Sequence, residues 1–336
     1  LPRTVKVRII LGLALAGATS GCSISRLATG ALADSLAESG SVYMSDEDPE
    51  LVEEAIPFGL KTMESVLAEH PEHFGLLVAL ASGFTSYAYG FIEMDAFALA
   101  PVDMEASDAR LARASKLYFR ARDYGVRALA VEVEDFEARL RSDPDAALAE
   151  LDKDHVEALY WTAAAWGLGI SASGLDPELV ADFPLVQAMA ARAITLDDDW
   201  DRGALHDFFV VLESERPGGD LDEAERHFRR ALELNGGHRA GTYVSMAENV
   251  CVKRQNGEKF VQLLNEALAV DVDVLPDERV VNLINQRRAR ILLERSADLF
   301  LDDPLAEEDA AAPASWGSGL ASDRSPRPNL GSDPSS

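Results

Sequence analysis

The stretch AERHFRRALELN, residues 224–235, carries the strongest structural signal in the chain. Ala224, Phe228 and Ala231 are spaced by four and three residues, which places all three on one face of an α-helix. Shorter echoes of this pattern recur at residues 193–197 (AITLD), 267–271 (ALAVD) and, more weakly, 63–71 (MESVLAEHP). Recurrence of one helical pattern indicates a repeated structural unit.

The spacing of the echoes identifies the kind of repeat. Ala193 lies 38 residues before Ala231, and Ala267 lies 36 residues after it. These intervals are close to the period of about 34 residues of the tetratricopeptide repeat, and residues 224–235 resemble its second helix, where small residues let two helices approach closely. We therefore predict an all-α fold: an array of antiparallel helical hairpins that resemble irregular tetratricopeptide repeats, with extra helices in residues 76–170.

Helix starts are marked by three Asp-Pro pairs, and no stretch predicts a sheet. Asp48-Pro49, Asp143-Pro144 and Asp176-Pro177 each place a capping carboxylate before a proline that suits the first helical turn. We predict one all-α domain over residues 46–301. Residues 302–336 are rich in Pro, Ser, Gly, Ala and Asp, which predicts a disordered tail, and we interpret Trp316 as a stranded aromatic within it.

The N-terminus has the pattern of a secretory signal. Arg3, Lys6 and Arg8 precede the apolar stretch IILGLALAGA, residues 9–18, and small residues then lead into Cys22. This order resembles the lipobox of bacterial lipoproteins, although Thr19 stands where that motif usually has leucine. We predict a signal peptide over residues 1–21, lipidation of Cys22 and a lipid-anchored tether over residues 22–45, with an ordinary secreted protein as the alternative. By the same resemblance, serine after the cysteine favours the outer membrane, and no other stretch predicts a membrane span.

Charge excludes one class of partner. The chain has 58 acidic against 31 basic residues, a formal net charge of −27, which cleavage before Cys22 would take to −30 because residues 1–21 hold three basic residues and no acid. Nucleic-acid binding depends on Lys and Arg that displace counterions, so we expect no nucleic-acid partner. With Cys22 acylated, Cys251 cannot pair with it, and we interpret Cys251 as a buried inert thiol.

An ordered set of blocks gives the chain a specific family resemblance. The blocks are GCS at 21–23, EDPELVEEAIP at 47–57, GLK at 59–61, LYFRARDYG at 117–125, YWTAAAWG at 160–167, and the stretches 224–234 and 282–293. Together they resemble the T component associated with tripartite ATP-independent periplasmic (TRAP) transporters.

This resemblance implies a role and a location. It implies a periplasmic, helical lipoprotein that self-associates, with a trimer as one candidate, and that is held to the membrane through its lipid anchor only. It implies a solute-binding protein of a TRAP transporter as partner, and an internal cavity or channel for an apolar or organic-acid ligand. The family supplies no catalytic residues, so we expect no enzyme activity.

Aromatic residues concentrated between positions 84 and 166 are candidates to line such a cavity. Small residues beside them, at 163–165, 167 and 169, leave space next to bulky rings, although core packing explains each ring equally well. A cluster of basic residues over 110–127 either neutralises acidic helices or binds an anionic ligand. The candidate cavity residues are Tyr87, Tyr118, Arg120, Tyr124, Arg127, Tyr160, Trp161 and Trp166.

Other chemistry lacks a supporting pattern in the sequence. His70 and His73 have no third ligand nearby, and Asp197, Asp199 and Asp201 lack the glycine and glutamate that a calcium loop needs at its sixth and twelfth positions. No Walker A, G-x-S-x-G or G-x-G-x-x-G element is present. We therefore predict no metal and no cofactor. The alternative to a transport role is a lipid-anchored helical-repeat scaffold for envelope or outer-membrane assembly, which the same anchor and repeats would serve.

Overall fold

The computed structural model describes residues 29–174, 176–216, 218–302 and 304–305, and within them the chain is helical with no strand. Residues 29–37 form a first helix. The N-terminal elements that follow are α2 (Gly40–Met44), α3 (Pro49–Leu67), α4 (Phe74–Tyr87), η1 (Ala88–Glu93), α5 (Met94–Leu99), α6 (Met104–Glu132), α7 (Phe136–Ser142) and α8 (Pro144–Ala149). The middle elements are η2 (Lys153–His155), α9 (Val156–Ala172), α10 (Pro177–Val180), α11 (Phe183–Leu196) and η3 (Trp200–Gly203). The C-terminal elements are α12 (Ala204–Glu215), α13 (Leu221–Asn235), α14 (Ala240–Met246), η4 (Ala247–Cys251), α15 (Gly257–Leu268), η5 (Pro276–Glu278), α16 (Arg279–Glu294) and α17 (Ser296–Leu299). The all-α fold class is thereby confirmed.

Each of the three Asp-Pro pairs begins a helix. The carboxylate of Asp48 accepts hydrogen bonds from the backbone N–H groups of Glu50 and Leu51, both at 3.1 Å, at the start of α3. Asp143 caps α8 and Asp176 caps α10 in the same way. These side chains satisfy backbone donors that have no partner within the helix, which fixes where the helix begins.

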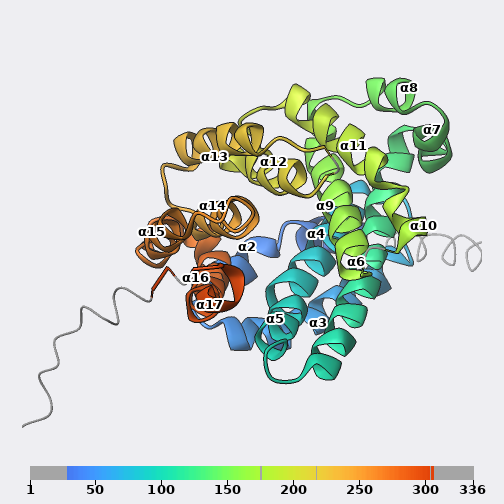
Figure 1. Ribbon diagram of the computed structural model, residues 1–336. Helices are drawn as coiled ribbons and strands as arrows, with labels where there is room; N and C mark the ends of the chain where they lie inside the picture. The colour runs from blue at the N-terminus through green and yellow to red at the C-terminus, as the bar shows by residue number, and fades with distance from the viewer. Residues whose placement is uncertain (1–28, 175, 217, 303, 306–336) are drawn as a thin grey trace, which may run out of the picture.

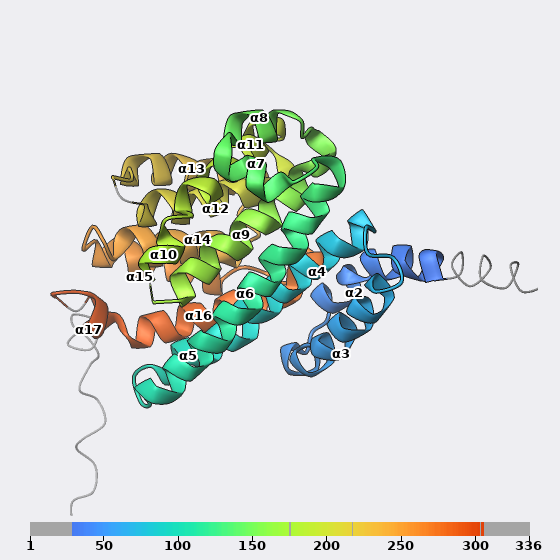
Figure 2. The same ribbon diagram turned by 90° about the vertical axis from the view of Figure 1, so that its right-hand side faces the viewer.

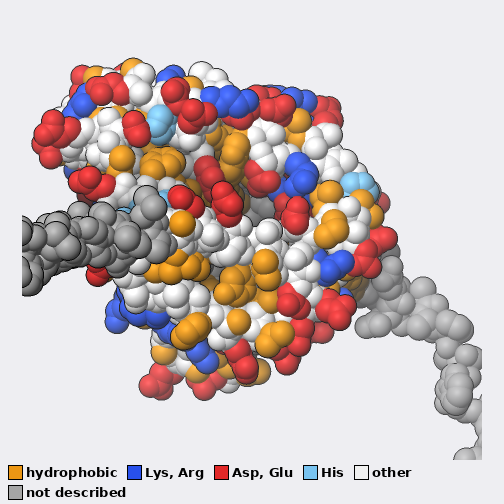
Figure 3. Space-filling model, turned by 180° about the vertical axis from the view of Figure 1, so that it is seen from behind, with side chains coloured by type: hydrophobic (Ala, Val, Ile, Leu, Met, Phe, Trp, Pro, Cys, Tyr) orange, Lys and Arg blue, Asp and Glu red, His pale blue; other side chains and the backbone are white. Residues whose placement is uncertain are grey.

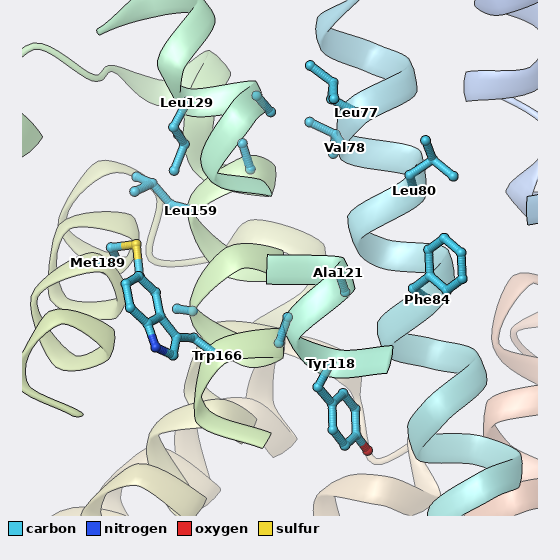
Figure 4. Packing of buried hydrophobic residues seen from close by; sticks show 14 of the residues in the cluster. Leu77, Val78, Leu80, Phe84, Tyr118, Ala121, Leu129, Leu159, Trp166 and Met189 are labelled. Atoms are coloured by element: carbon cyan, nitrogen blue, oxygen red, sulfur yellow. The ribbon is translucent and has the colours of Figure 1, made fainter. Parts of the chain in front are cut away.

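The centre of the fold is a layer of three long helical segments. The continuous run α4–η1–α5 lies beside α6, and α9 packs on the other side of α6 (Figures 1 and 2). Trp166 on α9 contacts the same buried cluster as Met189 on α11, while Tyr118 on α6 points between α6 and α4 (Figure 4). Both aromatic side chains are fully buried, so this layer supplies much of the apolar burial that stabilises the fold.

Gly125 allows α6 and α9 to approach closely. A Cβ atom at this position would lie 2.1 Å from Oγ1 of Thr162 and 3.2 Å from its Cα. No side chain larger than hydrogen fits without moving one of the two helices.

The C-terminal half is a series of shorter helices that pack on their neighbours in the sequence. Contacts join α12 to α13, α14 to α15, and α15 to α16, and these helices lie together on one side of Figure 1. The repeated alanines Ala193, Ala231 and Ala267 are all 0% exposed. Their burial agrees with the small-residue contacts expected from the repeated pattern, while a regular tetratricopeptide arrangement stays a prediction.

Two helical stretches are long and apolar enough to cross a membrane, judged by length and composition alone. They are Phe74–Leu99 and Pro177–Leu196. The first is mostly buried within the fold, as expected of a core helix in a globular protein, which passes the same test.

Candidate functional site

A cavity of about 560 Å³ lies where the N-terminal and C-terminal halves meet. One wall comes from residues 36–44 and from helices α3 and α4, and the opposite wall comes from η3, α12, α14 and the start of α16. The α9 helix contributes Tyr160 and Trp161 between the two walls. This volume is within the range of small-molecule sites, which is roughly 300 to 1,000 Å³.

The N-terminal wall is mostly apolar. Leu36 belongs to the segment expected to be a tether, and together with Ile56, Leu60 and Met63 it forms a hydrocarbon surface. Ile56, Leu60 and Met63 lie on the buried apolar face of α3, and this face lines the cavity. Part of the segment that precedes residue 46 is thus a wall of the candidate site.

Aromatic rings form the edge between the two walls. The ring of Tyr160 meets that of Trp161 at a centroid distance of 4.9 Å and that of Trp200 at 4.8 Å. Burial raises the pKa of Tyr160, so this phenol stays neutral at physiological pH. The rings offer flat surfaces on which an apolar or cationic group can lie.

The C-terminal wall is charged and is organised by Arg239. Its Nη1 atom donates to the backbone carbonyl of Asp201 at 2.7 Å, and its Nη2 atom donates to Oδ1 of Asp201 at 2.9 Å and to Oε1 of Glu278. Burial opposes the charge on Arg239, but the two carboxylates outweigh it and raise the pKa of the guanidinium. Burial raises the pKa of Glu278 despite the adjacent guanidinium.

A strained turn borders this wall. Asp201 and Arg202 both have left-handed backbone angles, with φ values of 43° and 52°. Such angles cost about 1–3 kcal/mol at residues other than glycine and are found mostly where surrounding contacts enforce them. The two hydrogen bonds from Arg239 supply that enforcement at Asp201.

Asp207 is the second acidic group in the wall. Its Oδ2 accepts a hydrogen bond from Oγ1 of Thr242 at 3.0 Å, and that hydroxyl accepts one from the Asn235 amide at 3.0 Å. The other carboxylate oxygen, Oδ1, is buried and has no hydrogen-bond partner. Burial raises the pKa of Asp207 to about 7, although Arg239 acts in the opposite direction. Near neutral pH this carboxyl therefore exists in both protonation states.

The residues proposed from the sequence fall into two groups. Tyr160 and Trp161 line the cavity, whereas the other six do not belong to its lining. Tyr87, Tyr118 and Trp166 are buried in the helical core. Two more of the six residues outside the lining, Arg120 and Tyr124, both contact Glu64, and the tyrosine hydroxyl lies 2.6 Å from Oε1 of this glutamate.

The basic cluster of α6 is engaged by groups of the chain itself. Burial opposes ionisation of Glu64, but hydrogen bonds from Lys61, Tyr124 and Arg120 outweigh it and lower the pKa of Glu64. The other contacts are Arg110 with Asp95, Arg113 with the Tyr87 hydroxyl, Arg122 with Asp123 and Glu137, and Arg127 with the carbonyl of Pro71. Arg110, Arg120 and Arg122 thus pair with carboxylates, as the neutralisation interpretation expects, whereas Arg113 and Arg127 contact neutral groups.

The remaining motifs have local partners. His70 lies 2.7 Å from the Thr29 hydroxyl and His73 lies 3.1 Å from Asp34. Within the described ranges, no group of three or more His, Cys, Asp or Glu side chains could hold a metal ion. Cys251 is buried, and burial raises the pKa of its thiol to about 11, as expected of an unreactive thiol. Cys22 and Trp316 lie outside the described residues.

The sequence alone did not point to the charged wall. Asp201, Asp207, Arg239 and Glu278 are distributed over 78 positions of a chain that holds 58 acidic residues, so nothing marks these four as neighbours. The one local signal is the Asp-rich stretch 197–201, which lacks the pattern of a calcium loop and is more typical of a connection between two helices of a hairpin.

A helical body that encloses a cavity with one apolar wall and one charged wall defines a class of protein that can hold a small amphipathic molecule. A profile of the family described as TRAP transporter T-component matches residues 45–300. The chain belongs to this family, which makes it an accessory component of a TRAP transporter. It is also 25% identical over 304 residues to a protein of Treponema pallidum (strain Nichols) described as "Uncharacterized protein", a match that covers 84% of this chain and 94% of the relative.

Proposed function

We propose that the protein is a periplasmic accessory component that binds the solute-binding protein of a TRAP transporter and holds an amphipathic ligand in the cavity between its two halves. Family membership supports the transport role. The observation that carries the ligand-holding part is the cavity itself, about 560 Å³ in volume, with hydrocarbon from α3 on one side and charged groups from η3, α12, η5 and Arg239 on the other.

The proposed location rests on the N-terminal sequence. Arg3, Lys6 and Arg8, the apolar stretch 9–18 and the cysteine that follows Gly21 support export and lipidation of Cys22. A diacylated cysteine with Ser23 after it would place the protein on the outer membrane.

We further propose that the helical hairpins form an irregular tetratricopeptide-like array and that the protein self-associates, with a trimer as one candidate. Such arrays offer extended surfaces for protein partners.

A cavity-filling substitution tests the ligand-holding part. Ala79 lines the cavity from α4, so Ala79→Phe would fill part of the space, whereas Ala112→Phe makes the same change on the exposed side of α6. Both proteins would be purified from envelopes, and co-purified small molecules would be extracted and identified by mass spectrometry. We expect the wild type and Ala112→Phe to carry the same ligand and Ala79→Phe to lose it. An equal yield of ligand from all three proteins would contradict a ligand in this cavity.

A further inference from the structure

We propose that the ligand of this cavity is a cationic amphipath, with an ammonium group at the wall of Asp201, Asp207 and Glu278 and a hydrocarbon body against the wall of α3. This inference rests on the proposed function, since it names the chemical class of the ligand that the cavity holds. It selects a positive head group over the negative head group of an organic acid.

Charge balance is the first argument. The side chains that line the cavity include four carboxylates, from Asp201, Asp207, Asp277 and Glu278, and two guanidiniums, from Arg202 and Arg239. Four carboxylates against two guanidiniums give the lining a formal charge of −2, which becomes −1 when Asp207 is protonated. A carboxylate head would enter a negative potential, whereas an ammonium head would be attracted to it.

The arginines have little capacity left for an anion. Nη1 of Arg239 donates to one protein acceptor and Nη2 donates to two. The Nε atom has no hydrogen-bond partner, but it is buried and therefore out of reach of a ligand in the cavity. Arg202 lies 3.6 Å from Glu278, and its side chain is 44% exposed, so its charge is already partly compensated and screened by water. Bidentate capture of a carboxylate would require one of these contacts to break.

The aromatic edge supplies a second kind of contact for a cation. Tyr160 and Trp161 line the cavity between its charged and apolar walls. An ammonium group within about 6 Å of such a ring is attracted by the negative face of the π system. Carboxylates and aromatic faces together recognise protonated or quaternary amines, while an organic acid gains nothing from the rings.

The potential of the whole molecule acts in the same direction. With a formal net charge of −27, the protein attracts cations and repels anions as they approach. Figure 3 shows carboxylate side chains spread over the face seen from behind, with fewer basic side chains among them. The charges that line the cavity and the net charge of the whole protein therefore both favour a positively charged ligand.

Asp207 links ammonium binding to pH. Its carboxyl faces Arg239 and Thr242, and Asp201 and Glu278 are the nearby acids. A cation stabilises the ionised form of this carboxyl and is bound best by it. Affinity for an ammonium ligand should therefore rise between pH 6 and pH 8, and the rise should be absent in Asp207→Asn.

Three ligands of equal chain length test the assignment on the full chain. Octylamine, octanol and octanoate would be titrated into the protein after delipidation, with isothermal titration calorimetry as the readout at pH 6 and pH 8. We expect octylamine to bind at least about tenfold more tightly than octanoate at pH 8, with octanol between them. Asp207→Asn should weaken octylamine binding about tenfold and leave octanol binding unchanged, while the exposed control Asp298→Asn should match the wild type.

The outcomes separate this inference from the proposed function. Equal or tighter binding of octanoate would overturn the cationic assignment and leave the ligand-holding role in place. Binding of none of the three ligands would overturn the cationic assignment, and unchanged ligand recovery from Ala79→Phe would overturn the ligand-holding role. If Asp207→Asn fails to fold, Asp277→Asn, which removes an exposed carboxylate at the cavity rim, should lower octylamine affinity severalfold.

Discussion

The guanidinium of Arg239 holds Asp201 by two hydrogen bonds, one to its backbone carbonyl at 2.7 Å and one to its carboxylate at 2.9 Å. Asp201 lies in the η3 turn, ahead of α12, whereas Arg239 immediately precedes α14. The pair therefore joins two segments 38 positions apart and fixes a left-handed turn at the border of the cavity.

Loss of Arg239 should destabilise the protein. Arg239→Gln leaves Glu278 half-buried without its main partner and releases Asp201 from its left-handed conformation. We expect the free energy of unfolding to fall by about 3 kcal/mol, in the range for breaking a buried ion pair, as measured by urea denaturation. Arg202→Gln removes an exposed guanidinium beside the same glutamate and should cost less than about 0.5 kcal/mol. Equal effects of the two substitutions would show that the Arg239 contacts are not a structural link.

Gly125 should tolerate no side chain. In Gly125→Ala the new methyl group would overlap Thr162 across the contact between α6 and α9. We expect a loss of about 1–3 kcal/mol, as for other overpacked cores. Gly40→Ala is the matched control, because nothing lies within 4 Å of the added Cβ and alanine is favoured over glycine in helices. Unfolding curves that coincide for the two variants would contradict the close approach of α6 and α9.

Arg288 and Glu248 form an ion pair whose two members should be coupled in their effect on the free energy of unfolding. Two hydrogen bonds of 2.7 Å join them, and Arg288 is 8% exposed beneath the ring of Phe97. Arg288→Met leaves Glu248 unpaired in a half-buried position, which should cost about 3 kcal/mol. The double variant Arg288→Met/Glu248→Gln should recover at least half of that loss. Purely additive effects in this double-mutant cycle would show that the two side chains do not interact.

The histidine pair His206 and His227 should make the protein less stable in mild acid. Their Nδ1 atoms lie 2.8 Å apart, and burial, followed by the neighbouring His206, lowers the pKa of His227 from 6.5 to about 4. The unfolded chain then binds more protons than the folded chain between pH 6.5 and pH 4. Stability is fully present above pH 6.5 and is lost as pH falls through this window. Charged groups around the pair are Asp198, Glu213, Glu223, Arg226 and Arg230.

Comparison with His227→Gln isolates this effect. Between pH 7 and pH 5 the wild type should lose roughly 1 kcal/mol more than the variant, after allowance for solvent screening at this half-buried site. Asp207 has its pKa raised to about 7 and so titrates in the opposite sense, but it is present in both proteins and cancels in the difference. Parallel stability curves for the two proteins would contradict a neutral buried histidine.

Much of the fold could be predicted because its signals are local. A carboxylate before proline caps a helix through backbone groups two or three residues away, so Asp48, Asp143 and Asp176 mark helix starts without any knowledge of the rest of the chain. The repeated alanines Ala193 and Ala231 predict a buried face through the helical period alone.

Most of the candidate site could not be predicted, because its residues meet only after folding. The cavity lining runs from Leu36 to Asn282, and no local pattern relates an acid in the η3 turn to an arginine before α14. The concentration of aromatic residues between positions 84 and 166 predicts that a cavity is lined from this range. Two of these aromatics, Tyr160 and Trp161, do line the cavity. The periodicity of α6 and α9 places Tyr118 and Trp166 on apolar faces, and such faces pack against other helices more often than against a ligand.

The most direct test of the transport role is to identify the partners of the protein in its own envelope. The chain would be tagged after Leu301, gently crosslinked in intact cells, and recovered for mass spectrometry. We expect to recover a solute-binding protein together with TRAP permease subunits. Recovery of outer-membrane assembly factors without any TRAP component would contradict the transport role and would support a helical-repeat scaffold instead.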